Sequence, residues 1–338
     1  MYQSFNLPLC RETRAEYGGW EGLRDDCAAL GLQGVEGIWG GADIPSDFPP
    51  DLLVGYHLTF YPDWLDIYRE DWTALLRKFG SRDAVRRFYG GEGPEVLLRL
   101  YRADLERAAA LGARYVVFHV TDVSIEEGYT YRWLHSNREV IDAAAELARR
   151  LLAGREWPFA FLVENQWWPG FTFTEPEETA RLLEAVRYPR TGILLDTGHL
   201  MNANPALATE AEGLRFIGEM LDRHGPLCRR IQGVHLHQSL SGAYVRAQTG
   251  FLPPLPADYG ARYGVSYGHI QRIDRHEPWT HPAVAGLVAR IAPQYLTHEL
   301  AASGRAARRR AVQTQLETLR RGRLESCGGR VHPEARKF

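Results

Sequence analysis

The chain has 338 residues, a formal net charge of −2 and 45% hydrophobic residues, the composition of a globular protein with a large core. No run approaches the roughly 20 apolar residues of a transmembrane helix, and the first residues lack a signal-peptide core. Four cysteines without paired spacing favour reduced thiols. We therefore expect a cytoplasmic protein without a membrane partner, and the near-neutral charge does not support general nucleic-acid binding.

Lysine occurs only as Lys78 and Lys337, and neither residue lies at the end of a predicted strand. Schiff-base chemistry and a lysine general base both need a lysine in the active site. The sequence therefore disfavours these two mechanisms.

Short apolar runs alternate with amphipathic stretches along the chain. The apolar runs predict eight strands, at 2–7, 32–38, 52–58, 114–120, 159–164, 191–196, 231–237 and 294–300. The stretches between them predict helices near 19–30, 63–78, 94–111, 136–153, 176–187, 206–224, 280–291 and 303–321. Ser136 before Glu139 and Thr174 before Glu177 match the capping-box pattern that begins a helix.

This alternation predicts a (β/α)₈ TIM barrel in a single domain, residues 1–325, followed by a C-terminal tail, 326–338. A doubly wound open sheet is the alternative, and the lack of a glycine-rich phosphate motif after the first strand disfavours it. Two insertions interrupt the pattern. We expect a helical insertion at 61–93, after strand three, and a long loop at 238–273, after strand seven.

Residue types that bind metal ions follow six of the eight predicted strands. The carboxyl ends of barrel strands line one common mouth, so these residues should meet there. The strand ends and the loop IDRHEPW together contribute nine such residues: His57, His119, Glu164, Asp196, His199, His235, Asp274, His276 and Glu299.

Four of these residues are carboxylates, and their mutual repulsion is a reason to expect cations. At about 4–6 Å and an effective dielectric constant of about 20, each pair costs roughly 3–4 kcal/mol. Six pairs would cost on the order of 20 kcal/mol, which exceeds the usual stability of a domain, roughly 5–15 kcal/mol. Either protons or cations must neutralise these carboxylates. The neighbouring imidazoles repel additional protons but coordinate metal ions readily, so we expect two to three divalent cations.

Four further histidines, His237, His269, His281 and His298, are interpreted as supporting or structural residues. His235 and His237 share one face of strand seven, because side chains alternate along a strand. By the same alternation, His298 should point away from the mouth that Glu299 faces.

These motifs resemble the xylose isomerase-like TIM barrels (AP endonuclease family 2), which include endonuclease IV and many sugar isomerases and epimerases. The resemblance spans roughly residues 2–300. Glu164 in LVEN, Asp196 in LLDTGH, His235 in GVHLH and Glu299 in THEL match the four residues that hold one ion in the isomerases. The other five match further ligands of the three-zinc set of endonuclease IV: His57, His119, His199, Asp274 and His276. The segment HLTFYPDWLDIYRED departs from that family's DNA-inserting region.

Two classes of enzyme remain open. In a phosphoester hydrolase with two to three Zn²⁺, Mn²⁺ or Fe²⁺ ions, Glu164 and Glu299 would position the metals and the attacking water, and Arg272 or Arg275 would pair with phosphate. In a sugar or sugar-phosphate isomerase or epimerase with one ion, the two glutamates would be acid and base. Tryptophans would then stack on the sugar, with Trp39, Trp133, Trp167, Trp168 and Trp279 as candidates.

A catalytically silent metal-binding scaffold is disfavoured by the cost of gathering so many charges. The expected partner is a small sugar or phosphoester, and the sequence does not determine the oligomeric state.

Overall fold

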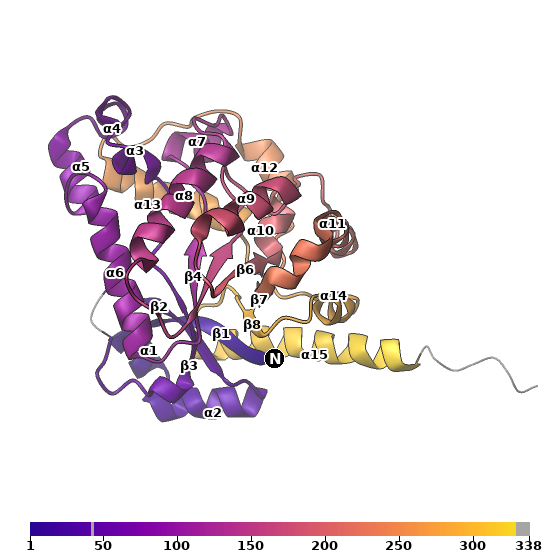
Figure 1. The fold of residues 1–338 in the computed structure, drawn as a ribbon. Coiled ribbons are helices and arrows are strands. Elements are labelled where there is room, and N and C mark those ends of the chain that lie inside the picture. The colour runs from indigo at the N-terminus through magenta and orange to yellow at the C-terminus, as the bar shows by residue number, and fades with distance from the viewer. Residues whose placement is uncertain (42–43, 329–338) are drawn as a thin grey trace, which may run out of the picture.

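The eight predicted strands form a closed barrel, in which neighbours follow in chain order and β8 pairs with β1 (Figure 1). This computed structural model describes residues 1–41 and 44–328. The strands are β1 (Tyr2–Leu9), β2 (Gly34–Trp39), β3 (Leu53–His57), β4 (Tyr115–His119), β5 (Ala160–Glu164), β6 (Thr191–Asp196), β7 (Ile231–His235) and β8 (Tyr295–His298). All neighbouring pairs are parallel, so every strand ends at the same mouth. The barrel prediction is confirmed, and the open sheet was wrong.

The register of the strands brings the predicted ligands to one level. His119 at the end of β4 is the backbone partner of Glu164 at the end of β5. Asp196 at the end of β6 is likewise level with His235 at the end of β7. Side chains at equal height on adjacent parallel strands lie side by side, so residues distant in sequence become neighbours at the mouth.

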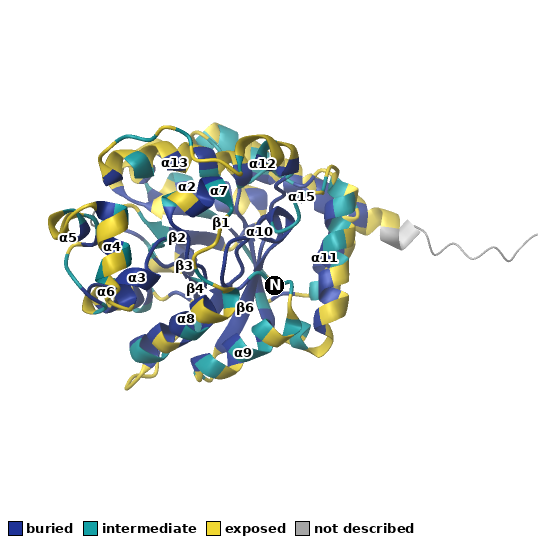
Figure 2. Ribbon diagram, turned by 90° about the horizontal axis from the view of Figure 1, so that it is seen from above, coloured by how far each residue is buried: buried dark blue, intermediate teal, exposed yellow. Residues whose placement is uncertain are grey.

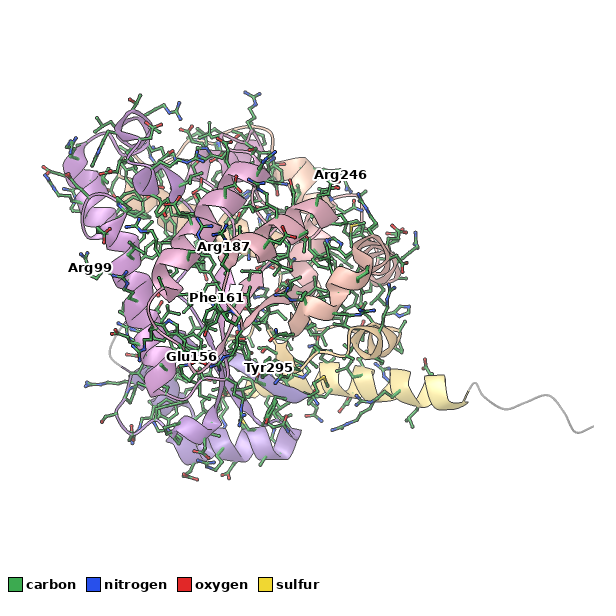
Figure 3. All side chains as sticks on the ribbon, in the orientation of Figure 1. Arg99, Glu156, Phe161, Arg187, Arg246 and Tyr295 are labelled. Carbon is green, nitrogen blue, oxygen red and sulfur yellow. The ribbon has the colours of Figure 1, made fainter. Side chains whose placement is uncertain are left out.

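Apolar side chains fill the barrel below the mouth. Alternate strand residues point inward, and they form a cluster of Val54, Tyr115, Val117, Leu162, Leu194 and Tyr295. Tyr295 lies at the lower end of the barrel in Figure 3, whereas Arg246 lies at the opposite, upper end. The interior is therefore a packed core rather than a channel, and the Tyr115 hydroxyl of this core hydrogen-bonds to the buried Glu36 and Thr297.

Helices surround the barrel and bury their apolar faces against the strands, while their outer faces stay exposed (Figure 2). The longer ones are α2 (Trp20–Leu30), α6 (Glu95–Ala110), α8 (Asn137–Leu152), α9 (Pro176–Val186), α11 (Glu210–His224), α14 (Val284–Ile291) and α15 (Arg305–Gly328). The short ones are α1 (Arg11–Glu16), η1 (Pro50–Leu52), α7 (Ile125–Thr130), α10 (Thr197–Asn202) and η2 (Gly225–Arg230). In the part of the chain that the structure describes, no helix is both long and apolar enough to cross a membrane.

The two insertions lie where we expected them and pack against each other. The first contains α3 (Leu65–Tyr68), α4 (Trp72–Phe79) and α5 (Arg82–Tyr89). The second is not wholly a loop, because it contains α12 (Gly242–Gln248) and α13 (Tyr259–Ile273). Tyr259 stacks on Phe79 with ring centroids 3.9 Å apart and meets Phe88 edge-on at 4.9 Å. Aromatic contacts therefore join the insertions into one layer.

One of the two predicted capping boxes is confirmed. The Ser136 side chain accepts from the Glu139 backbone, and the Glu139 carboxylate accepts from the Ser136 backbone. The Thr174 box was wrong: Pro176 occupies the first turn of α9, so Glu175 precedes the helix and Thr174 bonds to Thr172 instead.

The predicted boundary of the C-terminal tail, at residues 325 and 326, lies within α15. The rest of that tail, residues 329–338, lies outside the described residues.

Candidate metal centre

Ligand-type side chains gather at the mouth of the barrel in three groups, in each of which the ligand atoms lie within 4.8 Å of one another. The first group is His57, His119 and Glu164. The second group is Glu164, Asp196, His235 and Glu299. The third group is His199, His237, Asp274 and His276. The three groups contain all nine predicted residues, and the third group also contains His237.

Asp196 ends β6 and also begins α10, which explains the motif LLDTGH. Its Oδ1 caps the helix by accepting from the His199 backbone N–H at 2.6 Å. The Asn165 side chain accepts from the Asp196 N–H at 2.8 Å and donates to the Asp196 carbonyl at 3.0 Å. A strand end, a helix cap and a neighbouring amide thus hold this carboxylate in the site.

Two histidines are oriented by backbone carbonyl groups. Nδ1 of His57 lies 2.9 Å from the Leu58 carbonyl, and Nδ1 of His199 lies 3.0 Å from the Asn165 carbonyl. A carbonyl oxygen only accepts, so Nδ1 of His57 carries a proton and donates it, whereas Nδ1 of His199 also lies 2.9 Å from Nε2 of Gln166. In the neutral His57 ring, Nε2 then has a free lone pair directed at the ligand group, which is the usual arrangement of a metal-binding histidine.

Buried polar atoms in each group lie close together without forming hydrogen bonds. The pairs are Glu164 Oε2 with His119 Nε2, Glu299 Oε2 with His235 Nδ1, and Asp274 Oδ2 with His276 Nε2, each 2.7 Å apart. Among the described residues, Glu164 Oε2, Glu299 Oε2 and His276 Nε2 have no hydrogen-bond partner. Atoms that converge on one point without bonding to one another fit a shared divalent cation.

The ionisable groups of the centre shift one another's pKa values. Burial opposes ionisation of Glu164, but His119 and His235 lower its pKa well below the usual value. In the same way His235 lowers the pKa of Glu299 to about 2. Asp274 raises the pKa of His276 to about 9, although burial acts in the other direction. Without metal, protons on histidines with a raised pKa, such as His235 and His276, would therefore balance the carboxylates, and a bound cation would displace them.

The segment that carries Asp274 and His276 is held between the ends of two strands. The backbones of Gln238 and Glu277 exchange two hydrogen bonds, of 2.8 and 3.1 Å, and the Ala301 N–H donates to the His276 carbonyl at 2.9 Å. His276 has φ +48°, a left-handed conformation that is uncommon outside glycine. These bonds hold the strained residue so that its ring faces the third group.

Sequence reasoning missed two residues of the centre. His237, which we had interpreted as a supporting residue, belongs to the third group, and its Nε2 lies 2.9 Å from Asp196 Oδ2. Glu36 on β2 was not considered, yet it is fully buried, accepts from Tyr115 at 2.6 Å and lies 3.0 Å from His235 Nε2. Its signal in the sequence is a lone carboxylate within the apolar run GVEGI.

The other three of the four further histidines, His269, His281 and His298, have structural surroundings, as predicted. His298 points away from the mouth and bonds to Gln315 at 2.8 Å, and burial lowers its pKa to about 4. His269 contacts the Tyr244 hydroxyl, and His281 accepts from the Ala283 N–H.

The predicted substrate-binding arginines lie beside the second insertion. Arg272 lies over the Tyr244 ring at 5.3 Å, and Arg275 pairs with the Glu277 carboxylate. Both line a cavity of about 500 Å³, and none of the residues of the three groups lines it. Their predicted contact with substrate phosphate stays a prediction.

The candidate tryptophans occupy different environments. Trp167 lies closest to the three groups, with its ring 5.1 Å from that of His199 and 4.2 Å from that of Trp168. Trp279 is fully buried in the core, whereas Trp133 is 40% exposed. Trp39 lies beneath the guanidinium group of Arg107 at 4.9 Å.

Several solved structures share this fold. Endonuclease IV from Thermus thermophilus is 17% identical with a TM-score of 0.53, covering 96% of this chain and 100% of that chain. A D-tagatose 3-epimerase-like protein is 14% identical with a TM-score of 0.51, covering 98% and 100%. The IOLI protein with a zinc atom is 11% identical with a TM-score of 0.51, covering 97% and 99%. At these identities the likeness shows the fold alone.

No curated protein matches the sequence. The family model described as "Xylose isomerase-like TIM barrel" matches residues 24–321, nearly the whole chain. The strand ends that it spans carry the clustered histidines and carboxylates described above, which are typical of a metal-dependent enzyme. The chain belongs to the xylose isomerase-like TIM barrel family.

Proposed function

We propose that this protein is a phosphoester hydrolase that uses two to three divalent cations, of Zn²⁺, Mn²⁺ or Fe²⁺. The observation that carries the proposal is the position of Glu164 between two groups. Its Oε2 faces His119 at 2.7 Å in the first group, and its Oε1 faces His235 at 3.0 Å in the second. A carboxylate shared in this way brings two cations close together, which is the arrangement used in two-metal phosphoester hydrolysis.

The charge of the centre favours an anionic substrate. Five buried or partly buried carboxylates surround the groups: Glu36, Glu164, Asp196, Asp274 and Glu299. Within the described residues, no lysine or arginine forms an ion pair with any of them. Three divalent cations would bring six positive charges against these five negative ones. The loaded centre would then attract a phosphate ester more strongly than a neutral sugar.

The residues of the chain have separate roles in this proposal. When bound, the cations would neutralise phosphate oxygens and lower the pKa of a water molecule. Glu164 would keep two of them at a fixed separation. Asn6 donates to Glu299 Oε1 at 2.9 Å, which leaves Oε2 to face the second group and to accept a proton.

The depth of the centre supports a small substrate. Glu164, Asp196 and His235 have no exposed surface, and the most exposed ligand side chain, that of His276, is 25% exposed. A small phosphoester reaches such a site more readily than a DNA duplex does. Arg272 and Arg275 remain our candidates for contacts to more distant parts of the substrate.

A sugar isomerase or epimerase is the second candidate, and the second group favours it. Glu164 and Glu299 lie 3.0 and 2.7 Å from Nδ1 of His235, so both carboxylates would flank one ion as acid and base. This reaction needs a single ion, and the first and third groups would then be dispensable.

Ion stoichiometry and a substrate panel separate the two candidates. The purified protein, loaded with Zn²⁺, Mn²⁺ or Fe²⁺, is analysed for bound metal and incubated with phosphomonoesters, phosphodiesters, a duplex containing an abasic site, and ketoses. We expect at least two ions per chain and phosphate release from small esters. One ion per chain with ketose turnover, unchanged in His57→Asn and His276→Asn, would establish the isomerase instead.

A further inference from the structure

The third group differs from the other two in that it shares none of its residues. The first group has three residues and the second has four, and both of these numbers include the shared Glu164. The third group has four residues that belong to no other group, and one of them is His237. Its composition, three imidazoles and one carboxylate, matches a complete tetrahedral set for Zn²⁺.

His237 is held firmly against the other members of the third group. It has no exposed surface, and its ring meets that of His276 edge-on with centroids 4.2 Å apart. Its Nε2 lies 2.9 Å from Asp196 Oδ2, and its Nδ1 has no hydrogen-bond partner among the described residues. A fully buried ring nitrogen without a partner costs stability unless a ligand satisfies it.

The chain also provides space for this ring. Gly198 stands between Asp196 and His199 in α10, and a Cβ atom built on it would lie 2.0 Å from His237 Cε1. Any side chain at position 198 would displace the His237 ring from the third group. The glycine in LLDTGH therefore leaves room for a second histidine in the third group.

We propose that His237 is a metal ligand and completes a closed, four-residue site in the third group. Closed four-ligand zinc sites are structural, whereas catalytic sites keep a position for water or substrate. The third ion then fixes the Asp274–His276 segment, and the positions for water and substrate belong to the first group, which has only three residues, and to Glu164, which the first and second groups share. This inference rests on the proposed metal content but not on the nature of the substrate.

Cobalt loading tests the inference without measuring activity, because tetrahedral Co²⁺ absorbs visible light strongly. In the wild-type protein, we expect the tightest ion to give a tetrahedral spectrum that inorganic phosphate does not change. His237→Gln keeps an N–H that donates to Asp196 but removes the imidazole ligand. It should lose the tetrahedral spectrum and bind the tightest ion about 100-fold more weakly or worse, while His281→Gln, outside the three groups, should behave as wild type.

Each outcome decides the question. An unchanged spectrum and stoichiometry in His237→Gln would overturn the inference and leave the proposed hydrolase standing. A wild-type spectrum that phosphate alters would show an open third site, and this result holds even if the variant fails to fold. A wild-type protein that binds no ion would overturn both proposals.

Discussion

Two regions of this molecule bury several carboxylates, and they are neutralised in different ways. The first is the metal centre. The second, which we call the lysine cluster, consists of Asp63, Asp66, Lys78, Asp122 and His135 and joins the first insertion to the loop after β4 and the segment before α8. In the lysine cluster, Lys78 Nζ lies 2.6 Å from Asp63 and 2.7 Å from Asp66.

The lysine cluster contains a cation of its own, Lys78. Burial raises the pKa of Asp122 to about 7, so this third carboxyl group is readily protonated, and its Oδ1 accepts from the N–H groups of Trp64 and Leu65 at 2.8 Å. Among the described residues, only imidazoles form ion pairs with the carboxylates of the metal centre. The comparison teaches that a buried carboxylate cluster without a lysine or arginine of its own indicates a site for added cations.

Removal of metal should show the difference between the metal centre and the lysine cluster most clearly. After dialysis against a chelator, we expect hydrolysis to be lost completely and the free energy of unfolding to fall. An ion at a thousand times its Kd stabilises the fold by about 4 kcal/mol. Activity assays and thermal unfolding before and after readdition of Zn²⁺ measure both effects. Full activity and stability after verified removal of metal would contradict the comparison.

Loss of the shared carboxylate should be the most damaging single substitution in the metal centre. Glu164→Gln removes a ligand from the first and second groups together, so we expect metal affinity and kcat/KM to fall by more than about 100-fold. Metal analysis and kinetics provide the measurement. Glu156→Gln, at an exposed carboxylate, is the control and should match wild type. Two ions retained in Glu164→Gln would rule out the bridging role.

Loss of the internal cation should damage the lysine cluster without affecting metal content. Lys78→Met leaves Asp63 and Asp66 buried without their cation, which costs roughly 3–5 kcal/mol in the free energy of unfolding. Denaturant unfolding measures this loss, and Arg77→Met on the exposed side of α4 should change stability by less than about 0.5 kcal/mol. If Lys78→Met is as stable as Arg77→Met, the cluster is not neutralised as we describe.

The pH dependence of the lysine cluster has a definite sign. Burial opposes ionisation of Asp66, but His135 and Lys78 lower its pKa to about 2 in the folded protein, compared with about 3.9 in an unfolded chain. A lowered pKa contributes stability above the unfolded value, and this contribution is lost as the pH falls from about 4 towards 2. Unfolding curves across this range should show the loss in wild type and a smaller loss in Asp66→Asn.

The smallest effect that we expect is the release of protons from the metal centre when metal binds. The metal-free His276 has a pKa of about 9, so at neutral pH an incoming cation must displace its proton. For each proton that metal binding displaces, the apparent affinity for metal falls about tenfold when the pH falls by one unit. Calorimetric titration in two buffers of different ionisation enthalpy counts these protons. Binding without proton release at pH 7 would contradict the protonated state that we assign.

Much of the fold and the centre could be predicted from local patterns. Short apolar runs and the amphipathic stretches between them indicate a parallel barrel, and in a barrel the ends of all strands share one mouth. His57, His119 and Glu164 were therefore identified as neighbours before any contact was known. The insertion at 238–273 was harder, because glycine, proline and tyrosine conceal the helical pattern of α13.

His237 and Glu36 show where local patterns become insufficient. The ring of His237 reaches the third group only because Gly198, in another strand–helix junction, leaves room for it. Glu36 lies 3.0 Å from His235 because side chains of β2 and β7, which are not neighbours in the barrel, meet in its interior. Neither relation is visible in the spacing of residues along the chain.

The order of strands and helices, the barrel, and the nine ligand-type residues at its mouth could be predicted from residue patterns, because apolar runs and strand-end positions are local properties. The division of these residues into three groups, the sharing of Glu164 and the place of His237 in the third group became visible only in the folded chain. Those facts depend on the register between strands and on the direction of each side chain across the barrel, which chain order does not specify.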